Sequence, residues 1–370
     1  MKKIAVSLLL SAICLSCQEA TDETADLVIR NARVYTVDSN RPWAESVAVK
    51  GEWISYVGSD EGAEEYVGES TRVIDAEGRL VLPGFIDSHN HIWAGSNPDA
   101  ISLSGLESLT ELQETVRAFA EERPDLEWIR GDGWEYTMFP DGGLPTADDL
   151  EGLTGGRPAL FVSYDAHTIW LNRAAMERMG ITAETKSVPF GELVLREGRP
   201  FGILKGTMGL TGEAEESLWQ FVPNRDQEDR YASLKKNLSD AVRYGITTIV
   251  EPQASVRRLP MYEKALEEGD LKSRLQIALY HPPGTTQKEV DRFAEARRDY
   301  NDDRIRVSAI KLYIDDVIEP HTAALLEPYA DRPGERGDMF YAPETFNEVV
   351  TRLDAQGFQL FIHAIGDRGI

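Results

Sequence analysis

Two histidines separated by one residue follow an apolar stretch that begins at Leu80. His89 and His91 come directly after Leu-Val-Leu-Pro-Gly-Phe-Ile-Asp-Ser, which is typical of a buried strand and the loop after it. Because alternate residues of an extended segment point to the same side, both imidazole rings could bind one ion of zinc or another transition metal. A histidine pair alone is more often a pair of loop residues, so the buried strand before it is the stronger evidence.

Several later apolar segments also end on a side chain that can do chemistry: Glu251, His281, Lys311 and His363. The carboxyl ends of parallel strands meet at one end of a barrel, and barrel enzymes keep their active sites there. We therefore expect His363 to approach the ion that His89 and His91 would share. The spacing predicts a metal site built from residues that are far apart in sequence.

Lys311 allows two interpretations. It lies between Ile310 and Leu312, and a lysine in a buried strand needs a polar partner for its amine. One interpretation is an ion pair with an acid such as Asp315. The other is a functional lysine whose pKa is lowered or whose amine is covalently modified.

The remaining candidates also have structural alternatives. His363 could bind the metal with Asp367 orienting its ring, or it could be a hydrogen-bonded core histidine, with Asp367 only beginning the next helix. His167 and Trp93 are candidates for substrate binding, and the alternatives are a structural histidine and a core tryptophan. The weaker candidates are His281, His321 and Glu251.

Helices and short apolar strands alternate through the second half of the chain. The expected strands are 245–250, 275–281, 305–313 and 358–363, and the expected helices are 231–244, 259–268, 287–298 and 343–356. This alternation is typical of a parallel sheet, and the number of units indicates a (β/α) barrel. The predicted fold class is therefore α/β, with about five barrel strands in this sequence.

Other regions complete the predicted domain plan. Residues 27–80 contain β-branched and aromatic segments separated by glycine turns, which predicts a small β domain ahead of a barrel at 81–370. Within the barrel, residues 134–220 lack a clean period, and we expect an insertion that covers the site, with a helix at 169–179.

The composition excludes some classes of partner and of metal ligand. The chain has 370 residues, with 63 acids against 39 bases and a formal charge of −24, so it would repel the phosphate backbone of nucleic acids. Its two cysteines are Cys14 and Cys17, so any metal must be held by His, Asp, Glu or Lys. We expect a small-molecule substrate and no nucleic-acid partner.

The first 17 residues have the pattern of an export signal. Lys2 and Lys3 precede an apolar run at 4–15 that is too short to span a membrane. The sequence Leu-Ser-Cys ending at Cys17 resembles a bacterial lipobox, which predicts an exported protein of the periplasm or cell envelope, lipid-anchored at Cys17. The alternative is a plain secretion signal. Residues 18–26 are polar and acidic, which indicates a flexible tether.

With these residues in place, the chain resembles the amidohydrolase superfamily and, within it, the YtcJ-like branch that includes N-substituted formamide deformylases. The similarity covers about residues 27–370 and is carried by the segments 81–91, 164–172, 310–315, 322–329 and 362–367. The resemblance implies a metal-dependent hydrolase on a distorted TIM (β/α)8 barrel, with a β-sandwich built from both ends of the chain. It also implies that His89 and His91 are ligands from the first strand. Lys311 would be the lysine that some members carboxylate to bridge two metals, and His363 the fifth-strand ligand.

The sequence departs from that family in two places. Asp315 is followed by Asp316, where the branch usually has glycine. The family's histidine after the sixth strand and its general-base aspartate after the eighth do not occur before the last residue, Ile370. We therefore expect the sequence to be part of a longer protein.

The predicted function is hydrolysis of a C–N bond outside peptides, in an amide, formamide or cyclic amide, by water activated on one or two divalent metal ions, of which zinc is the expected one. The alternative is a non-catalytic envelope lipoprotein, or an inactive fragment, that keeps a pocket for a small molecule or a metal.

Overall fold

The computed structural model describes residues 24–94, 99–139, 143–189, 191–206, 218, 220–222 and 227–370. Its contacts divide the chain into two compact units, Met1–Gly84 and Phe85–Ile370. The expected export signal with Cys17, and most of the expected tether at 18–26, lie outside the described residues. In the part of the chain that is described, no helix is both long enough and apolar enough to cross a membrane.

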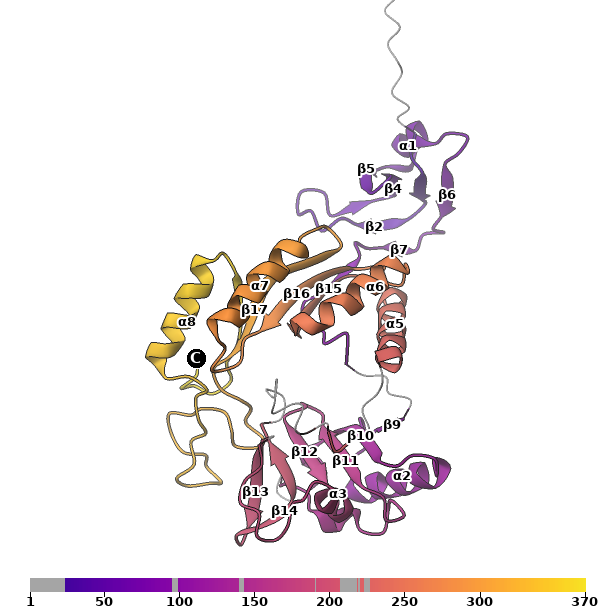
Figure 1. Ribbon diagram of the computed structural model, residues 1–370. Coiled ribbons are helices and arrows are strands. Elements are labelled where there is room, and N and C mark those ends of the chain that lie inside the picture. Colours follow the sequence, from indigo (N-terminus) through magenta and orange to yellow (C-terminus); the bar gives the residue numbers. More distant parts are fainter. Residues whose placement is uncertain are drawn as a thin grey trace, which may run out of the picture. The chain divides into compact units, whose positions relative to one another are not determined.

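The N-terminal unit contains two small sheets (Figure 1), one of four strands in the order β5-β4-β1-β6 and one of three in the order β3-β2-β7. The strands are β1 (Leu27–Arg30), β2 (Arg33–Tyr35), β3 (Trp43–Ala44), β4 (Ser46–Lys50), β5 (Trp53–Gly58), β6 (Arg72–Asp75) and β7 (Leu80–Val81), and α1 (Asp60–Ala63) and the 3-10 helix η1 (Glu64–Tyr66) follow β5. Gly51 has a φ of 58°, which the two-residue turn between β4 and β5 requires and which other residues disfavour. Val28 and Ala48 are completely buried and mark the core of the four-stranded sheet.

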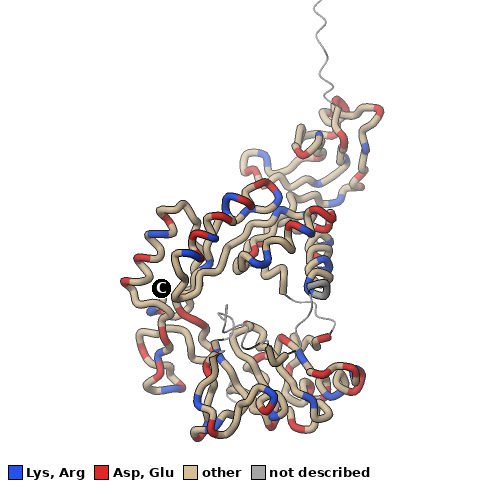
Figure 2. The backbone as a smooth tube through the Cα atoms, viewed as in Figure 1, with Lys and Arg blue, Asp and Glu red and all other residues tan. Residues whose placement is uncertain are grey.

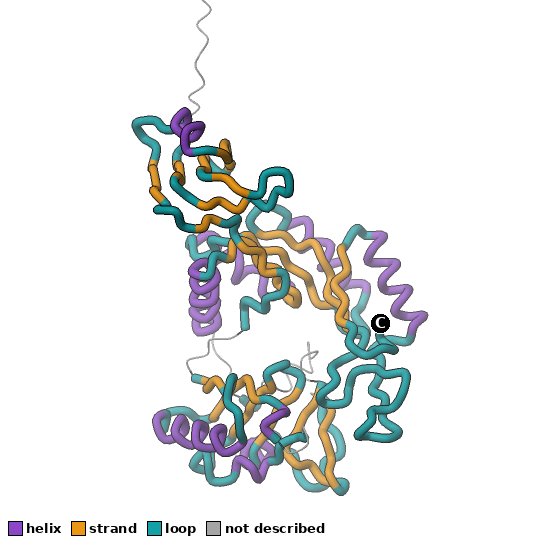
Figure 3. The backbone as a smooth tube through the Cα atoms, turned by 180° about the vertical axis from the view of Figure 1, so that it is seen from behind, coloured by secondary structure: helices purple, strands orange, loops and turns teal. Residues whose placement is uncertain are grey.

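The larger unit contains a parallel sheet of five strands in the order β18-β17-β16-β15-β8. The strands are β8 (Phe85–Asp87), β15 (Ile246–Ala254), β16 (Arg274–Tyr280), β17 (Ile305–Tyr313) and β18 (Gln359–His363). The helices between them are α5 (Gln227–Arg243), α6 (Leu259–Glu267) after the 3-10 helix η5 (Val256–Arg258), α7 (Gln287–Asp299) and α8 (Pro343–Ala355). Figures 1 and 3 show these strands side by side in one curved layer. The predicted α/β alternation is confirmed, in the form of a half-barrel.

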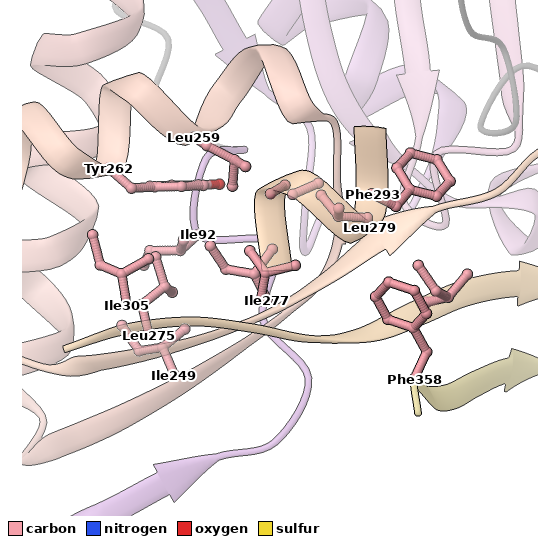
Figure 4. Packing of buried hydrophobic residues seen from close by; sticks show 14 of the residues in the cluster. Ile92, Ile249, Leu259, Tyr262, Leu275, Ile277, Leu279, Phe293, Ile305 and Phe358 are labelled. Carbon is pink, nitrogen blue, oxygen red and sulfur yellow. The ribbon is translucent and has the colours of Figure 1, made fainter. Parts of the chain in front are cut away.

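One buried apolar cluster joins this sheet to its helices (Figure 4). Leu275, Ile277 and Leu279 alternate along β16, and all three belong to the cluster with Tyr262 of α6 and Phe293 of α7. Successive side chains of a strand point to opposite faces. The residues between the cluster members therefore face the concave side of the half-barrel, and this alternation positions the candidate site.

Helix α7 shows why the outer helices form where the sequence predicts them. Val290, Phe293 and Ala296 recur at helical spacing and are buried against the sheet. Acidic and basic positions are interspersed along the rest of the helix, as Figure 2 shows. The helix begins at a capping box in which the Thr286 side chain accepts the Glu289 N–H and the Glu289 carboxylate accepts the Thr286 N–H.

A second sheet in the larger unit has six strands in the order β13-β14-β12-β11-β10-β9. The strands are β9 (Ala100–Ser102), β10 (Ile129–Trp134), β11 (Ala159–Ser163), β12 (Thr168–Leu171), β13 (Glu192–Arg196) and β14 (Arg199–Lys205). The helices beside it are α2 (Leu109–Glu122), α3 (Arg173–Arg178) and the 3-10 helices η2 (Tyr136–Met138) and η4 (Ala147–Leu150). This sheet begins at β9, ahead of the segment 134–220 in which we expected the insertion.

The predicted helix at 169–179 is wrong in its first part. Residues Thr168–Leu171 form β12, which pairs antiparallel with both β11 and β14, and only Arg173–Arg178 is helical. The β-branched and aromatic side chains of β12 favour a strand once a neighbour is available on each side. Asn172 separates the two elements, because its Oδ1 caps α3 by accepting the Ala175 N–H at 2.8 Å.

Candidate functional site

The register of the half-barrel places the candidates Lys311 and His363 on its concave face, each beside an aromatic side chain. Ile310 and Leu312 belong to the buried cluster with the helices, so Lys311 and Tyr313 point the opposite way. Lys311 pairs with Phe361 of β18, and Tyr313 pairs with His363. The Tyr313 and His363 rings lie 4.8 Å apart between centroids. Two neighbouring strands thus deliver a lysine, a histidine and two aromatic rings to one place.

The curvature of the sheet brings the two histidines of the loop after β8 to the same place. Strands β8 and β18 are the two edges of the sheet, about 19 Å apart if the sheet were flat. The His89 ring nevertheless lies 5.4 Å from the Phe361 ring and 5.5 Å from the His91 ring, between centroids. Partial burial, and then the Lys311 ammonium, lower the pKa of His89.

The loop after β8 holds these histidines by a set of local hydrogen bonds. The Asp87 carboxylate accepts the His89 N–H at 3.3 Å and the Asn90 side-chain amide at 2.7 Å. The Asn90 N–H donates to the Val250 carbonyl at 2.9 Å. The loop is therefore fixed to the end of β15.

Lys311 is 3% exposed, and its Nζ lies 4.5 Å from the Tyr313 ring centroid and 5.1 Å from that of Phe361. Burial lowers its pKa to about 8. The ion pair with Asp315 is not formed in the described structure, because the Asp315 carboxylate accepts the N–H groups of Ala324, Ile365 and Gly366. The structure therefore shows a buried lysine without the first interpretation's ion pair to Asp315.

His363 has one ring nitrogen engaged. Its Nε2 lies 3.2 Å from the Asp316 carbonyl, which fits donation from Nε2–H and leaves Nδ1 as an acceptor. Burial lowers the pKa of His363, against the effect of that hydrogen bond. Asp367, the predicted orienting acid, accepts the Leu326 N–H at 2.8 Å.

The six-stranded sheet contributes His167 to the same region. Its Nδ1 contacts the Asp316 carboxylate, and its ring lies 6.0 Å from the His363 ring between centroids. Beside it, the Tyr164 hydroxyl donates to Glu319 at 3.2 Å, and the buried Lys205 ammonium donates to the Pro320 carbonyl. The loop after β17 is therefore attached to the second sheet close to Lys311.

The other predicted residues lie in different surroundings. Trp93 is half-buried, and the Arg258 guanidinium carbon lies 3.6 Å from its ring centroid. His281 is buried with Nδ1 3.3 Å from the Tyr341 hydroxyl, and His321 has Nε2 2.7 Å from an Asp331 oxygen. Asp316 was not among the predicted residues, and the available signal was its place in the loop after a barrel strand. Glu251 was a weaker candidate, chosen for its place near a strand end, and its carboxylate lies 3.5 Å from His91 Nδ1.

The donor atoms of these residues are of types that bind divalent metals. Within the described ranges, no three His, Cys, Asp or Glu side chains are arranged as a complete ligand set. The His89 and His91 rings nevertheless lie 5.5 Å apart between centroids, a separation that one ion could bridge. Together with Lys311 and His363, they form a partial donor set of imidazoles and one amine.

Comparison with known proteins gives one family. A family model described as the amidohydrolase family matches residues 72–370. YtcJ of Bacillus subtilis is 28% identical over 343 residues, which are 90% of this chain and 62% of YtcJ. N-substituted formamide deformylase of Arthrobacter pascens is 26% identical over 353 residues, which are 93% of this chain and 64% of the deformylase. The chain therefore spans less than two thirds of the length of these two relatives.

Among solved structures, an uncharacterized metal-dependent hydrolase from Pyrococcus horikoshii is similar, with a TM-score of 0.64 and 21% sequence identity. The match covers 93% of this chain and 66% of that one. This similarity supports the fold.

Proposed function

Because the chain belongs to the amidohydrolase family, we propose that the protein is a metal-dependent hydrolase that cleaves a C–N bond outside peptides, in an amide, formamide or cyclic amide. The observation that carries the proposal is the buried Lys311 amine, which has no ion-pair partner among the described residues. It lies beside the Tyr313 and Phe361 rings, which contact the His363 and His89 rings on the concave face of the half-barrel. The similarity to a formamide deformylase supports this class of bond.

His89, His91, Lys311 and His363 are the residues that would hold one or two divalent ions, for which zinc is our first candidate. The metal, when bound, would lower the pKa of a water molecule and polarise the substrate carbonyl. Burial prepares the Lys311 amine for a covalent step. As the neutral amine it can add to CO2, forming an N–C bond and releasing one proton, and the resulting carbamate has two oxygen atoms that can bind metal.

We propose that His167 and Trp93 contact the substrate. His167 is carried into the site by the second sheet, and its contact with Asp316 holds the ring near His363. The Trp93 ring is covered on one side by Arg258, which fixes its plane.

The finer architecture is also a proposal. We propose that the half-barrel is part of a distorted (β/α)8 barrel and that the two N-terminal sheets are part of a β-sandwich. Apolar side chains on both edge strands support this, since Phe85 and Ile86 of β8 are 53% and 68% exposed and Ile362 of β18 is 40% exposed. Strands with exposed apolar edges normally receive a neighbour.

We further propose that the protein is exported and lipid-anchored through Cys17. The charged start, the short apolar run and the Leu-Ser-Cys sequence of the first 17 residues support this location.

Removal and return of the metal test the proposed function. The whole protein, treated with a chelator, should lose hydrolysis of N-formyl amines or cyclic amides and regain it with zinc. His89→Ala should lower the activity by at least about 100-fold. His321→Ala is the control, because its ring contacts Asp331 and not the candidate site. Hydrolysis that persists without metal and in His89→Ala would contradict the proposal, and binding without hydrolysis would indicate a non-catalytic protein.

A further inference from the structure

Glu251 is a completely buried carboxylate near the carboxyl end of β15. Its Oε1 lies 3.5 Å from His91 Nδ1 and accepts the Gln253 N–H at 3.0 Å. Its Oε2 accepts the Tyr262 hydroxyl at 3.4 Å. A carboxylate removed from water in this way is stable only with strong hydrogen-bond donors around it. The two donors other than His91 are neutral, so the carboxylate has capacity for a third.

His91 has a buried ring nitrogen that lacks a hydrogen-bond acceptor. Its Nδ1 is buried and has no hydrogen-bond partner at the geometry in the structure, although the Glu251 oxygen is only slightly beyond hydrogen-bond distance. A small rotation of the ring would make Nδ1–H donate to Glu251. This single bond would satisfy both the buried nitrogen and the buried carboxylate.

The backbone around His91 is already fixed beside β15. The Asn90 N–H donates to the Val250 carbonyl at 2.9 Å, and the Ala94 N–H donates to the His91 carbonyl at 2.8 Å. The Asn237 side chain donates to the Ile92 carbonyl at 2.9 Å. These bonds hold the backbone of His91 in place. The orientation of its ring, and which ring nitrogen carries the proton, must therefore be set by other contacts.

We propose that Glu251 is a positioning residue that holds His91 in the tautomer protonated on Nδ1 and so presents the Nε2 lone pair to the metal. The proposal rests on the proposed metal site. A metal-binding histidine commonly donates its other ring N–H to a carboxylate or a carbonyl, which fixes its tautomer and strengthens the ligand. Glu251 would thus orient His91, whereas the sequence suggested Asp367 as an orienting acid for His363; the Asp367 carboxylate accepts the Leu326 N–H.

The test uses the full chain, labelled with 15N-histidine and free of metal, at a pH where the rings are neutral. The chain has six histidines, so the His91 signals can be assigned by their loss in His91→Ala. The 15N shifts should show the proton of His91 on Nδ1 in the wild type. Glu251→Met removes the acceptor and should release the ring to a mixture of tautomers. Glu251→Gln keeps a carbonyl acceptor and should largely retain the Nδ1–H form.

Tyr262→Phe is the matched control, because it removes the donor to Oε2 and leaves Oε1 facing His91. It should leave the His91 tautomer unchanged. An Nε2–H tautomer in the wild type would overturn the proposal, and this measurement decides the question even if Glu251→Met fails to fold. An unchanged tautomer in a folded Glu251→Met would overturn it as well.

Zinc titration separates this proposal from the proposed function. Glu251→Met should weaken zinc binding by about 10- to 100-fold, and Glu251→Gln should weaken it less. If the wild type binds no zinc, the metal site fails while the tautomer result still stands. If the wild type, Glu251→Met and Glu251→Gln all bind zinc with equal affinity, the metal site stands and the role of Glu251 is refuted.

Discussion

At the scale of single residues, the main feature of the candidate site is that the buried Lys311 amine has no carboxylate partner among the described residues. A buried ammonium normally has a carboxylate beside it, but in the described structure Lys311 is bordered by the Tyr313 and Phe361 rings, and the nearby Asp315 is bonded to backbone N–H groups. Such a group destabilises the fold unless a modification or a ligand uses it. We therefore propose that the Lys311 amine has a functional role and does not stabilise the fold.

Replacing this amine tests that explanation. Lys311→Met keeps the length of the side chain and removes the polar group, so we expect the metal-free protein to gain about 1–3 kcal/mol in free energy of unfolding at neutral pH. Lys264→Met, which changes a half-exposed lysine 3.8 Å from Glu268, should change the stability little. Chemical denaturation of both variants measures the difference, and a destabilised Lys311→Met would show that the amine has a structural partner.

The sequence placed His89, His91, Lys311 and His363 near the carboxyl ends of strands, and these are the strand ends at which the structure has them. It could do so because strand ends can be recognised from local apolar runs followed by polar residues. The contact between His167 and Asp316, and that between His91 and Glu251, could not be predicted in the same way. Each joins segments whose proximity depends on tertiary packing.

At the scale of elements, the outer helices followed the expected boundaries because their signals are local. Helix α7 was expected at 287–298 and is found at Gln287–Asp299, with its capping box at Thr286 and Glu289. Strand β12 was missed because its residues take their conformation from β11 and β14 on either side. Capping can be predicted from sequence, whereas pairing between distant strands cannot.

The capping box makes the stability depend on pH. Hydrogen bonds from the Thr286 N–H and hydroxyl lower the pKa of Glu289 below its ordinary value of 4.5. A lowered pKa in the folded state means that the carboxylate stabilises the fold above pH 4.5 and that this contribution is lost as the pH falls through the lowered value. Glu289→Gln should therefore be less stable than the wild type by about 0.5–1 kcal/mol at pH 7.

The same difference should shrink as the solution is acidified, because the wild type then loses its carboxylate. Denaturation curves at several pH values measure it. Glu295→Gln, on the same helix, is the control, because it removes a carboxylate outside the capping box. A stability gap between wild type and Glu289→Gln that is constant with pH would refute this role of the cap.

The Asp315 carboxylate joins the loop after β17 to the loop after β18, since it accepts N–H groups from Ala324, Ile365 and Gly366. Asp315→Asn has only one acceptor oxygen and should lose about 1–3 kcal/mol of stability. Asp367→Asn removes an exposed carboxylate with a single bond and should change the stability by roughly 0.5 kcal/mol or less. Thermal unfolding compares the two, and equal effects would contradict the joining role of Asp315.

At the scale of the whole molecule, two sheets of the larger unit contribute residues to the candidate site. The half-barrel supplies the histidines and the lysine, and the six-stranded sheet is attached through His167, Tyr164 and Lys205 to the loop after β17. The half-barrel was predictable because alternating helices and strands have few possible arrangements. The six-stranded sheet was not, because its mixed parallel and antiparallel pairing leaves no regular period in the sequence.

The proposed location of the protein is tested by fractionation. In a bacterial host that processes lipoproteins, the wild-type chain should partition with membranes, and Cys17→Ser should move to the soluble fraction because no lipid can be attached. Cys14→Ser keeps Cys17 and should remain with the membranes. If wild type and Cys17→Ser partition alike, the lipid anchor is refuted.

We propose that His89, His91, Lys311 and His363 together hold a divalent metal. Zinc titration by calorimetry of the purified protein tests it most directly, with His89→Ala and His363→Ala as the changed sites and His321→Ala as the control. We expect one or two zinc ions to bind tightly to the wild type and to His321→Ala, and the affinity to fall by more than about 100-fold in the other two variants. Equal affinity in all four proteins, or no binding to the wild type, would contradict the claim.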